Sequence, residues 1–495
     1  MSGDVKMKII VGYPPLETKR KGATPLLSQN RQYQEFHNET FIFPVVLGTA
    51  ATWLKNNGND VIWLDCIAEK ISHGDFISLI KKEKPNLFFF ETKCPVVKQH
   101  WKMVDELKEK FPKLKIAICG DHVSFLPKET MKNCNVDFVI TSGYYDFAVV
   151  DLVEAIEKGA KIPEGIWHRN NVKIVEGGTY NLTKKLDEAP IIDRTLTKNH
   201  LYQKEYNLKG RPYAYIMSAR DCYWGKCKFC VWNFTLYPKG SFRFRSPENV
   251  MEEVKYLVDV AGIREIFDDA GTITVGEWLK KFCKLMIESG YNKKVVYSCN
   301  MRFGAVGLEE YKLMKEAGFR LLKFGLESAN QRTLDRIDKG IKVSDIEEGC
   351  KMAKKAGLDL HLTMMVGYFF ETRKEAMNTL KLARNLMLNG YADILQATVV
   401  VPYPGTPLYE EAVKENMLLV EKDDYEKFDM TMPILKTPDM TSEEIMGICD
   451  SIYSKIFLSP RYIARHLCKI KSLDDVKYTL KGLKAVLGHV KDFSK

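Results

Sequence analysis

The chain of 495 residues lacks the features that mark membrane, secreted and nucleic-acid-binding proteins. Its apolar runs fall far short of the ~18 residues of a membrane-spanning helix, so we expect no transmembrane segment. The first residues, MSGDVKMKIIVGYPP, lack a charged and then apolar leader and run straight into a strand-like segment. No block of about five or six like charges occurs, although the net charge is +10. We therefore expect a cytoplasmic protein without a nucleic-acid partner.

Internal repeats and low-complexity segments are also absent, which leaves ordinary globular domains. Hydrophobic residues make up 45% and charged residues 28% of the chain, so sizeable cores can form. The length suits about two or three domains. Most of the 12 cysteines stand alone in apolar segments, as free thiols of a cytosolic protein do. Only three of them are grouped.

Short apolar runs alternate with helical patterns in residues 1–160. The expected strands are KIIVG (8–12), VIWLD (61–65), LFFFET (87–92), KIAICG (115–120) and DFVIT (137–141). This pattern predicts a doubly wound α/β sheet of buried parallel strands, whose ligands lie at the carboxyl ends of the strands. That edge would consist of Tyr13–Pro15, Glu91–Cys94, Gly120–His122 and Thr141–Tyr145.

A second alternating region follows a connecting segment. Residues 161–210 are expected to form the linker, with a hairpin-like stretch, GIWHRNNVKIVEGG, at its start. Six strands are then expected in residues 211–405: YAYIMS (213–218), REIF (264–267), VVYSC (295–299), LLKFGLE (321–327), HLTMMVG (361–367) and ILQATVVV (394–401). Six β/α units predict a partial (β/α)6 barrel of the TIM type, with functional residues at the strand carboxyl ends. Residues 406–495 are expected to form a helical C-terminal region.

Capping residues mark several helix starts in this second half. Ser246-Pro247 predicts an N-cap followed by proline at the first helical position. Ser344 with Glu347, and Thr441 with Glu444, predict two capping boxes.

The three grouped cysteines, Cys222, Cys227 and Cys230, lie in SARDCYWGKCKFCVWN, directly after the first barrel-like strand. A loop at a strand end can gather three thiolates, which are ligands for an iron–sulfur cluster or for zinc. Structural zinc sites usually have four ligands, and no second C-x-x-C pair occurs, although Cys299 or a histidine could complete a set. From these residues alone both metals remain open. Three ligands on a four-iron cluster would leave one iron available.

The chain resembles the radical S-adenosylmethionine (SAM) superfamily. That family usually binds a 4Fe-4S cluster through C-x3-C-x2-C with an aromatic residue before the last cysteine, the position that Phe229 holds here. This chain departs by one residue, as C-x4-C-x2-C, and has Gly-Tyr-Phe-Phe-Glu-Thr where the family often has a Gly-Leu-Pro-Gly-Glu-Thr-like turn. The resemblance covers about 200 residues and implies SAM contacts at the ends of the second to fifth barrel strands, from Asp268, Asp269, Asn300, Arg302, Glu327, Ser328 and Gly367.

Structural roles for the same residues remain open alternatives. Asp268 and Asp269 could cap the following helix. Glu327 could pair with Arg332 or Arg336, and Lys339 could either reach the SAM carboxylate or be a solvated surface lysine.

The order of a flavodoxin-like (Rossmann-like) sheet before the barrel resembles the cobalamin-binding class of that superfamily, which includes methyltransferases and cyclases. The resemblance implies corrin contacts from the sheet edge, namely Tyr13, Thr92, Gly120, His122, Ser142 and Tyr144. The D-x-H-x-x-G pattern that supplies a histidine to cobalt in other cobalamin proteins is absent, so we expect no histidine below cobalt. A sheet that binds nothing and only supports the barrel is the alternative.

These resemblances imply three cofactors, a 4Fe-4S cluster, SAM and cobalamin, and a methyltransferase. A 5′-deoxyadenosyl radical would activate an unactivated carbon, and methylcobalamin would supply the methyl group. A non-methylating rearrangement or cyclisation, and a zinc-bearing scaffold without activity, remain alternatives. We expect a reductant such as flavodoxin or ferredoxin as partner. The substrate stays open among a peptide, a lipid and a small metabolite, and no catalytic side chain is assigned.

Overall fold

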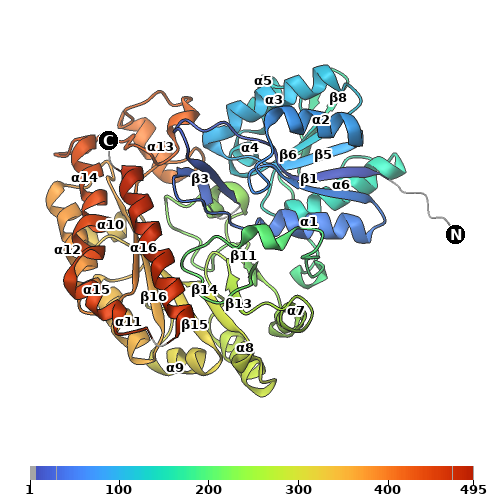
Figure 1. Ribbon diagram of the computed structural model, residues 1–495. Coiled ribbons are helices and arrows are strands. Elements are labelled where there is room, and N and C mark those ends of the chain that lie inside the picture. Colours follow the sequence, from blue (N-terminus) through green and yellow to red (C-terminus); the bar gives the residue numbers. More distant parts are fainter. Residues whose placement is uncertain (1–6, 29–30, 471, 494–495) are drawn as a thin grey trace.

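The computed structural model describes residues 7–28, 31–470 and 472–493. Two α/β bodies lie side by side in Figure 1, the first coloured blue to cyan and the second green to orange. The red C-terminal helix α16 lies across the second body. Among the described residues, no helix is long and apolar enough to cross a membrane.

The first body is built on a seven-stranded sheet in the order β4-β1-β5-β6-β7-β8-β9. Its strands are β1 (Lys8–Tyr13), β4 (Asp60–Asp65), β5 (Leu87–Glu91), β6 (Lys115–Cys119), β7 (Phe138–Ile140), β8 (Ile166–Asn170) and β9 (Lys173–Val175). The first five are parallel, with the strand order of flavodoxin-like sheets, so all five expected strands are confirmed. The expected hairpin forms β8 and β9, which extend this sheet antiparallel beyond residue 160.

Helices cover both faces of this sheet. They are α1 (Val45–Asn56), α2 (His73–Glu83), α3 (Val97–Lys110), α4 (Asp121–Phe125), α5 (Pro127–Asn133) and α6 (Tyr145–Lys158). Side chains alternate along a strand, so Phe88 of β5 packs on Phe76 of α2, while Phe89 faces Tyr145 of α6. Burial on both faces explains why β5 reads as a continuous apolar run.

The second body is a six-stranded parallel sheet in the sequential order β10-β13-β14-β15-β16-β17. Its strands are β10 (Tyr213–Ile216), β13 (Glu265–Asp268), β14 (Val296–Met301), β15 (Phe319–Glu327), β16 (Asp359–Val366) and β17 (Ile394–Val399). The outer helices are α7 (Pro247–Asp259), α8 (Glu277–Glu288), α9 (Leu308–Glu316), α10 (Gln331–Arg336), α11 (Val343–Lys355), α12 (Arg373–Leu388) and α13 (Pro407–Lys414). This is the predicted partial barrel.

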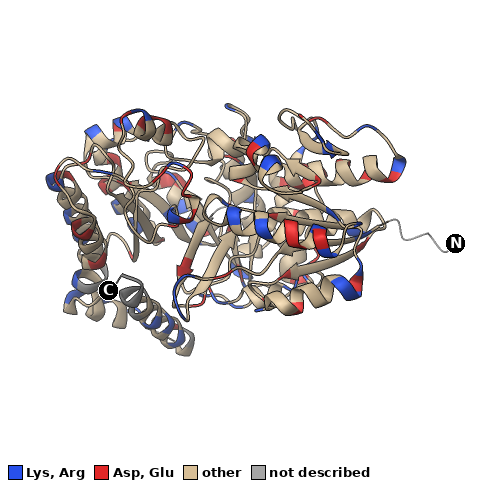
Figure 2. Ribbon diagram, turned by 90° about the horizontal axis from the view of Figure 1, so that it is seen from above, with Lys and Arg blue, Asp and Glu red and all other residues tan. Residues whose placement is uncertain are grey.

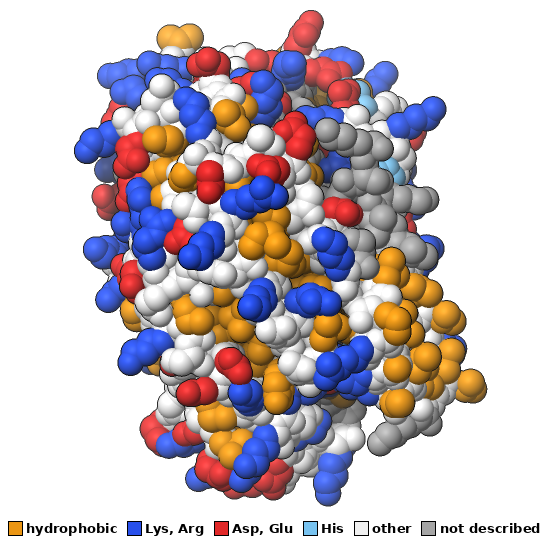
Figure 3. Space-filling view, turned by 90° about the vertical axis from the view of Figure 1, so that its left-hand side faces the viewer, with side chains coloured by type: hydrophobic (Ala, Val, Ile, Leu, Met, Phe, Trp, Pro, Cys, Tyr) orange, Lys and Arg blue, Asp and Glu red, His pale blue; other side chains and the backbone are white. Residues whose placement is uncertain are grey.

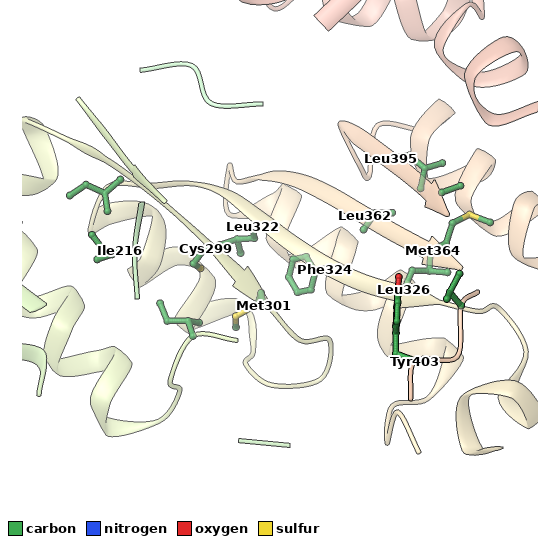
Figure 4. Close-up of a cluster of buried hydrophobic side chains, with 14 of the residues drawn as sticks. Ile216, Cys299, Met301, Leu322, Phe324, Leu326, Leu362, Met364, Leu395 and Tyr403 are labelled. Carbon is green, nitrogen blue, oxygen red and sulfur yellow. The ribbon is translucent and has the colours of Figure 1, made fainter. Parts of the chain in front are cut away.

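Alternation along the barrel strands separates the core from the lumen. Leu322 and Phe324 of β15 lie in a buried apolar cluster with Cys299 of β14, shown in Figure 4. Lys323 and Gly325 of the same strand line an internal cavity instead. The barrel interior is therefore polar where the outer core is apolar.

Two of the three predicted helix starts are confirmed. The Ser246 hydroxyl accepts a hydrogen bond from the amide of Asn249 at the start of α7 (3.2 Å), and Thr441 and Glu444 exchange bonds before α14 (Ser442–Ile452). The capping box of Ser344 and Glu347 is wrong. Helix α11 begins at Val343 with Lys342 as its N-cap, two residues earlier than predicted. The N3 position therefore falls on Asp345, which accepts the bond from the Lys342 amide (2.8 Å).

Several short elements were not predicted. An antiparallel hairpin, β2 (Thr24–Ser28) and β3 (Arg31–Phe36), precedes α1, and β11 (Ala219–Arg220) pairs with β12 (Arg243–Phe244) around the cysteine loop. Short helical turns connect the larger elements: η1 (Cys94–Val96), η2 (Leu186–Glu188), η3 (Asn199–Tyr202), η4 (Trp232–Leu236), η5 (Tyr291–Lys293), η6 (Tyr425–Lys427) and η7 (Tyr453–Phe457). Helices α15 (Pro460–Leu467) and α16 (Leu473–Phe493) follow, in agreement with the expected helical C-terminal region.

Candidate functional site

The cysteine loop leaves the barrel at the carboxyl end of β10. Pairing of β11 with β12 fixes both ends of the loop, and Gly225 turns the chain through the left-handed region (φ 59°) between the first two cysteines. Cys222, Cys227 and Cys230 are partly exposed, whereas eight of the other cysteines are buried and Cys468 is exposed. Partial exposure at a strand end is the environment that a bound cofactor requires.

All three cysteines line one cavity of about 320 Å³. Phe229 and the strand-end residues Asn300, Arg302 and Glu327 line it too, and Lys339 reaches it from the loop after α10. Seven residues predicted from the resemblance thus meet in one space, because the carboxyl ends of parallel strands share one edge.

A cation and a carboxylate form the floor of this cavity. The ammonium of Lys339 lies 2.7 Å from Glu327 Oε1 and 5.9 Å from the centre of the Phe229 ring. Glu327 itself adopts the left-handed region (φ 57°) at the end of β15. The alternative pairing of Glu327 with Arg332 or Arg336 is wrong, since Arg332 binds Glu375 at 2.6 Å and the guanidinium of Arg336 lies at 4.0 Å from Glu411.

Burial and the nearby ammonium of Lys339 shift the pKa values of the cysteine thiols in opposite directions. Burial raises the pKa of Cys227 to about 11, and the positive charge of Lys339 lowers it. Burial likewise raises the pKa of Cys222, which the same lysine lowers. A cation beside thiols favours the thiolate form that binds iron.

The donor set fits an iron–sulfur cluster. Each thiolate of a cluster binds a different iron, so the three sulfur atoms need not converge on one point. In the described parts of the chain, no three Cys, His, Asp or Glu side chains are grouped closely enough to hold a single metal ion. Cys299, considered above as a fourth ligand for zinc, lies buried in the outer core of the barrel.

Four predicted SAM residues lie outside the cavity lining. The Asp268 carboxylate accepts bonds from the Ser218 amide (2.9 Å) and the Tyr297 hydroxyl (3.0 Å), which ties β10, β13 and β14 together. Asp269 accepts a bond from the Asn300 side chain (3.2 Å) and so orients a residue that does line the cavity. Neither acts as a helix cap, because α8 begins at Glu277.

The other two lie at the ends of β15 and β16. The Ser328 hydroxyl lies 3.3 Å from the hydroxyl of Thr379 on α12, and therefore points toward the helix layer. Gly367 adopts φ 96°, and its amide donates to Glu371 Oε2 (2.8 Å). The SAM contacts predicted for all four residues stay predictions.

Trp224 and Arg302 form one wall of the cavity. The guanidinium of Arg302 lies 4.2 Å from the centre of the Trp224 ring, whose indole nitrogen donates to the Asp338 carbonyl (2.7 Å). The Arg302 guanidinium also donates to the Gly340 carbonyl (2.6 Å). In the sequence, this wall is marked by the tryptophan between the first two cysteines. The fold then brings Trp224 against Arg302, directly after β14.

The loop continues from Cys230 into contact with the first sheet. Turn η4 follows, and the carbonyl of its last residue, Leu236, accepts a bond from the amide of Gly143 (2.7 Å). A side chain at Gly143 would overlap the ring of Tyr237, at 2.4 Å. The buried pair of Arg220 and Asp146 (2.7 Å) provides a second connection. The carboxyl edge of the first sheet therefore touches the cysteine loop.

The six residues predicted to contact cobalamin all lie at this edge. The Tyr13 hydroxyl donates to Glu91 (2.6 Å), which also pairs with the buried ammonium of Lys93 (3.0 Å). Thr92 bonds to His100 (2.6 Å), and a side chain at Gly120 (φ 126°) would lie 2.0 Å from the Thr92 carbonyl.

The remaining rim residues are held by their neighbours. His122 Nε2 lies 3.2 Å from Glu129, and the ring of Tyr425 from η6 packs against the imidazole at 4.5 Å. The Ser142 hydroxyl accepts from the Tyr144 amide (3.1 Å), and the Tyr144 hydroxyl donates to the Ser241 carbonyl (3.0 Å).

Several buried polar groups on this side of the molecule have no hydrogen-bond partner among the described residues. Among them are His122 Nδ1 and the hydroxyls of Tyr145 and Tyr403. Buried polar groups are normally satisfied, so these groups fit an added ligand with a polar periphery, such as the amide-bearing edge of a corrin. The role of the six rim residues in cobalamin binding stays a prediction.

Residues 217–383 match the family model of the radical SAM superfamily. Together with the partial barrel and the three-cysteine loop, this match identifies the second body as a radical SAM domain. The radical SAM resemblance drawn from the sequence is confirmed.

Named relatives extend over most of the chain. An uncharacterized methyltransferase of Pyrococcus horikoshii is 27% identical over 465 residues, which cover 93% of this chain and 95% of the relative. An anaerobic magnesium-protoporphyrin IX monomethyl ester cyclase of Cereibacter sphaeroides is 24% identical over 417 residues, which cover 82% of this chain and 65% of that protein.

Two solved structures share the whole two-body fold. One is the cobalamin-dependent S-adenosylmethionine radical enzyme OxsB, solved with aqua-cobalamin and S-adenosylmethionine. Its TM-score is 0.69 at 13% identity, and the match covers 98% of this chain and 72% of the OxsB chain. The radical S-adenosylmethionine methyltransferase TsrM of Kitasatospora setae, solved with cobalamin and a [4Fe-4S] cluster, has a TM-score of 0.68 at 12% identity and covers 95% and 99%. The fold predicted from the sequence, a flavodoxin-like sheet before a partial barrel, is confirmed.

Proposed function

We propose that this protein is a cobalamin-dependent radical SAM methyltransferase that methylates an unactivated carbon. The observation that carries the proposal is the shared cavity of Cys222, Cys227 and Cys230 with the strand-end residues of a radical SAM barrel. The fold and the names of the relatives support the same class. A bound cluster with SAM supplies a 5′-deoxyadenosyl radical, and bound methylcobalamin supplies the methyl group.

The side chains of the cavity would hold the cluster, orient SAM and shield the radical from water. The three cysteines are the metal ligands, and Lys339 keeps positive charge beside them. Asn300, Arg302 and Glu327 face the same cavity and offer an amide, a guanidinium and a carboxylate to the amino-acid and ribose parts of SAM. Phe229 and Trp224 supply apolar walls that limit water, which would otherwise compete for a radical.

The sheet edge is the site for the corrin. Glycine at 120 lets the chain approach the Thr92 carbonyl closely, and Tyr13, Thr92, His122, Ser142 and Tyr144 lie along the same carboxyl edge of the sheet. Because η4 joins this edge to the cysteine loop, the two cofactors would face each other across a short distance. A low-potential flavodoxin or ferredoxin would reduce the cluster, and the free thiols suit a reducing cytoplasm.

The test is anaerobic reconstitution with iron, sulfide and hydroxocobalamin, followed by SAM labelled in its methyl group and a reductant. Methyl transfer predicts 5′-deoxyadenosine together with label in the product. Formation of 5′-deoxyadenosine with an unlabelled product would favour a rearrangement or cyclisation. Protein that binds zinc, no iron, and forms no nucleoside would contradict the proposal and favour the scaffold.

A further inference from the structure

The C-terminal helix α16 exposes a row of large apolar side chains. Leu473, Val476, Leu480 and Leu483 are 80, 37, 60 and 50% exposed. Their spacing of three and four residues places them along one side of the helix. Figure 3 shows the face of the molecule that lies on the left in Figure 1. Apolar side chains gather at its lower right, on the side where α16 lies. We call these four residues the leucine row.

The opposite side of α16 is occupied by the barrel. The guanidinium of Arg320, at the start of β15, lies 6.0 Å from the centre of the Tyr478 ring, and Asp475 pairs with Lys209. Ala485 is buried. The helix is therefore already docked through its other face, and the leucine row is directed away from the barrel.

Lysines follow the leucine row at a constant offset. Lys477, Lys481 and Lys484 each come one residue after a member of the row, and all three are exposed. Partial burial lowers the pKa of Lys481, and the positive charges of Arg211 and Lys477 lower it further. In Figure 2 this helix projects from the molecule near the end marked C, with blue segments along its ribbon.

Helix α15 has the same character. Ile463 and Leu467, four residues apart, are exposed, and Arg461 is exposed on the same short helix. Residues 459–495 contain nine Lys and Arg against three Asp and Glu. These residues thus carry a net charge of +6, out of +10 for the whole chain.

The charge decides between two occupants of the leucine row. Two copies of the chain packed along this row would bring Lys477 and Lys484 of both copies to the flanks of one seam, where like charges repel. An anionic lipid surface instead accepts the leucines into its acyl boundary and pairs the lysines with phosphate groups. A helix with a strong apolar row and a lysine-rich flank is typical of such interfacial contacts.

We propose that α16, with α15 beside it, docks the protein onto the surface of an anionic bilayer. The leucine row enters the lipid interface while Lys481 and Lys484 contact the headgroups. The attachment is peripheral, since no described helix can span a membrane. The proposal goes beyond the methyltransferase function and does not rest on it.

The test is flotation of the full-length protein with vesicles of phosphatidylcholine alone or mixed with phosphatidylglycerol. We expect binding to the mixed vesicles that weakens in high salt. The double variant Leu480→Ser/Leu483→Ser should lose at least ~10-fold in partition coefficient, and Lys481→Glu/Lys484→Glu at least ~20-fold. Val172→Ser, which changes a 93% exposed valine between β8 and β9, is the matched control and should bind as wild type.

Circular dichroism and thermal melts check that each variant is folded. We expect every variant to fold as wild type, because all the substituted side chains are exposed. Three outcomes would overturn the proposal: no binding of the wild type to anionic vesicles, unchanged binding of the leucine variant, or a concentration-dependent dimer that only the leucine variant abolishes. Activity in the reconstitution assay without vesicles is a separate readout, so either idea can fail alone.

Discussion

The Lys339 ammonium and the Glu327 carboxylate lie 2.7 Å apart at the floor of the cysteine-lined cavity, and both side chains are almost fully buried. Each group offsets the cost of burying the other, so both can be kept in the cavity. A ligand with an ammonium and a carboxylate of its own, as SAM has, can engage both.

Glu327→Gln should therefore be costly. It leaves the buried ammonium of Lys339 without its counter-charge, and loss of one partner of a buried pair costs about 3–5 kcal/mol of unfolding free energy. SAM affinity should fall as well. Urea denaturation and equilibrium dialysis measure the two effects. Glu347→Gln, in the exposed pair with Lys351, is the control and should cost about 0–1 kcal/mol. Equal effects of the two variants would contradict the assigned role.

Replacement of a single cluster cysteine should abolish the chemistry. Cys222→Ala, Cys227→Ala and Cys230→Ala are each expected to lose the brown colour, most of the bound iron and all release of 5′-deoxyadenosine, because two thiolates hold a cluster poorly. Iron and sulfide analysis with chromatography of the nucleoside measures this. Cys468→Ala changes an exposed thiol elsewhere and should keep all three signals. Retention of colour and nucleoside by any cluster variant would refute the ligand assignment.

The sheet edge can be tested through its glycines. Gly120→Ala would place a methyl group 2.0 Å from the Thr92 carbonyl at a φ that favours glycine, so we expect a loss of about 1–3 kcal/mol and weaker cobalamin binding. Gly143→Ala should act similarly through the ring of Tyr237. Spectroscopic titration with hydroxocobalamin compares both with Gly74→Ala, which meets open space. Wild-type affinity in both edge variants would place the corrin elsewhere.

Stability should depend on pH through Glu371. Burial raises the pKa of this carboxyl from 4.5 to about 7, and the Gly367 amide lowers it in part. Between about pH 4.5 and 7 the folded form holds a proton that the unfolded form has released, so stability falls as pH rises, by up to about 3 kcal/mol. Glu371→Gln should reduce this slope, and a smaller one should remain because burial also raises the pKa of Asp65 to about 6 and of Asp221 to about 7. At pH 8 the variant should need more urea to unfold than wild type, and a slope unchanged from wild type would contradict the role of Glu371.

The sequence predicted the strands better than the side-chain roles. The run at β5 is apolar because both sheet faces are covered, whereas β16 alternates between core residues such as Leu362 and lumen residues such as Thr363, and both patterns are local signals. The hairpin of β2 and β3 has no such signal, since its strands pair only with each other. Asp268 looks like a ligand in sequence, yet it bonds Ser218 and Tyr297 from two neighbouring strands, and such contacts become visible only when the sheet is assembled.

The cysteine loop shows the same limit. The three cysteines and Phe229 could be predicted from the sequence, because they lie close together in the chain. The contacts of Trp224 with Asp338 and of Lys339 with Phe229 were not predicted, because these partners are more than 100 residues apart and meet only when the barrel is assembled.

Leu236, six residues after Cys230, gives its carbonyl to Gly143 of the neighbouring sheet. The stretch between them is thereby tied to the first sheet at its end, whereas the stretch from Cys222 to Cys227 turns at Gly225 and contacts the barrel through Trp224. An inserted residue can be absorbed before Cys227 as a wider turn, which is where this chain carries its extra one. The same insertion after Cys230 would pull the two bodies out of register.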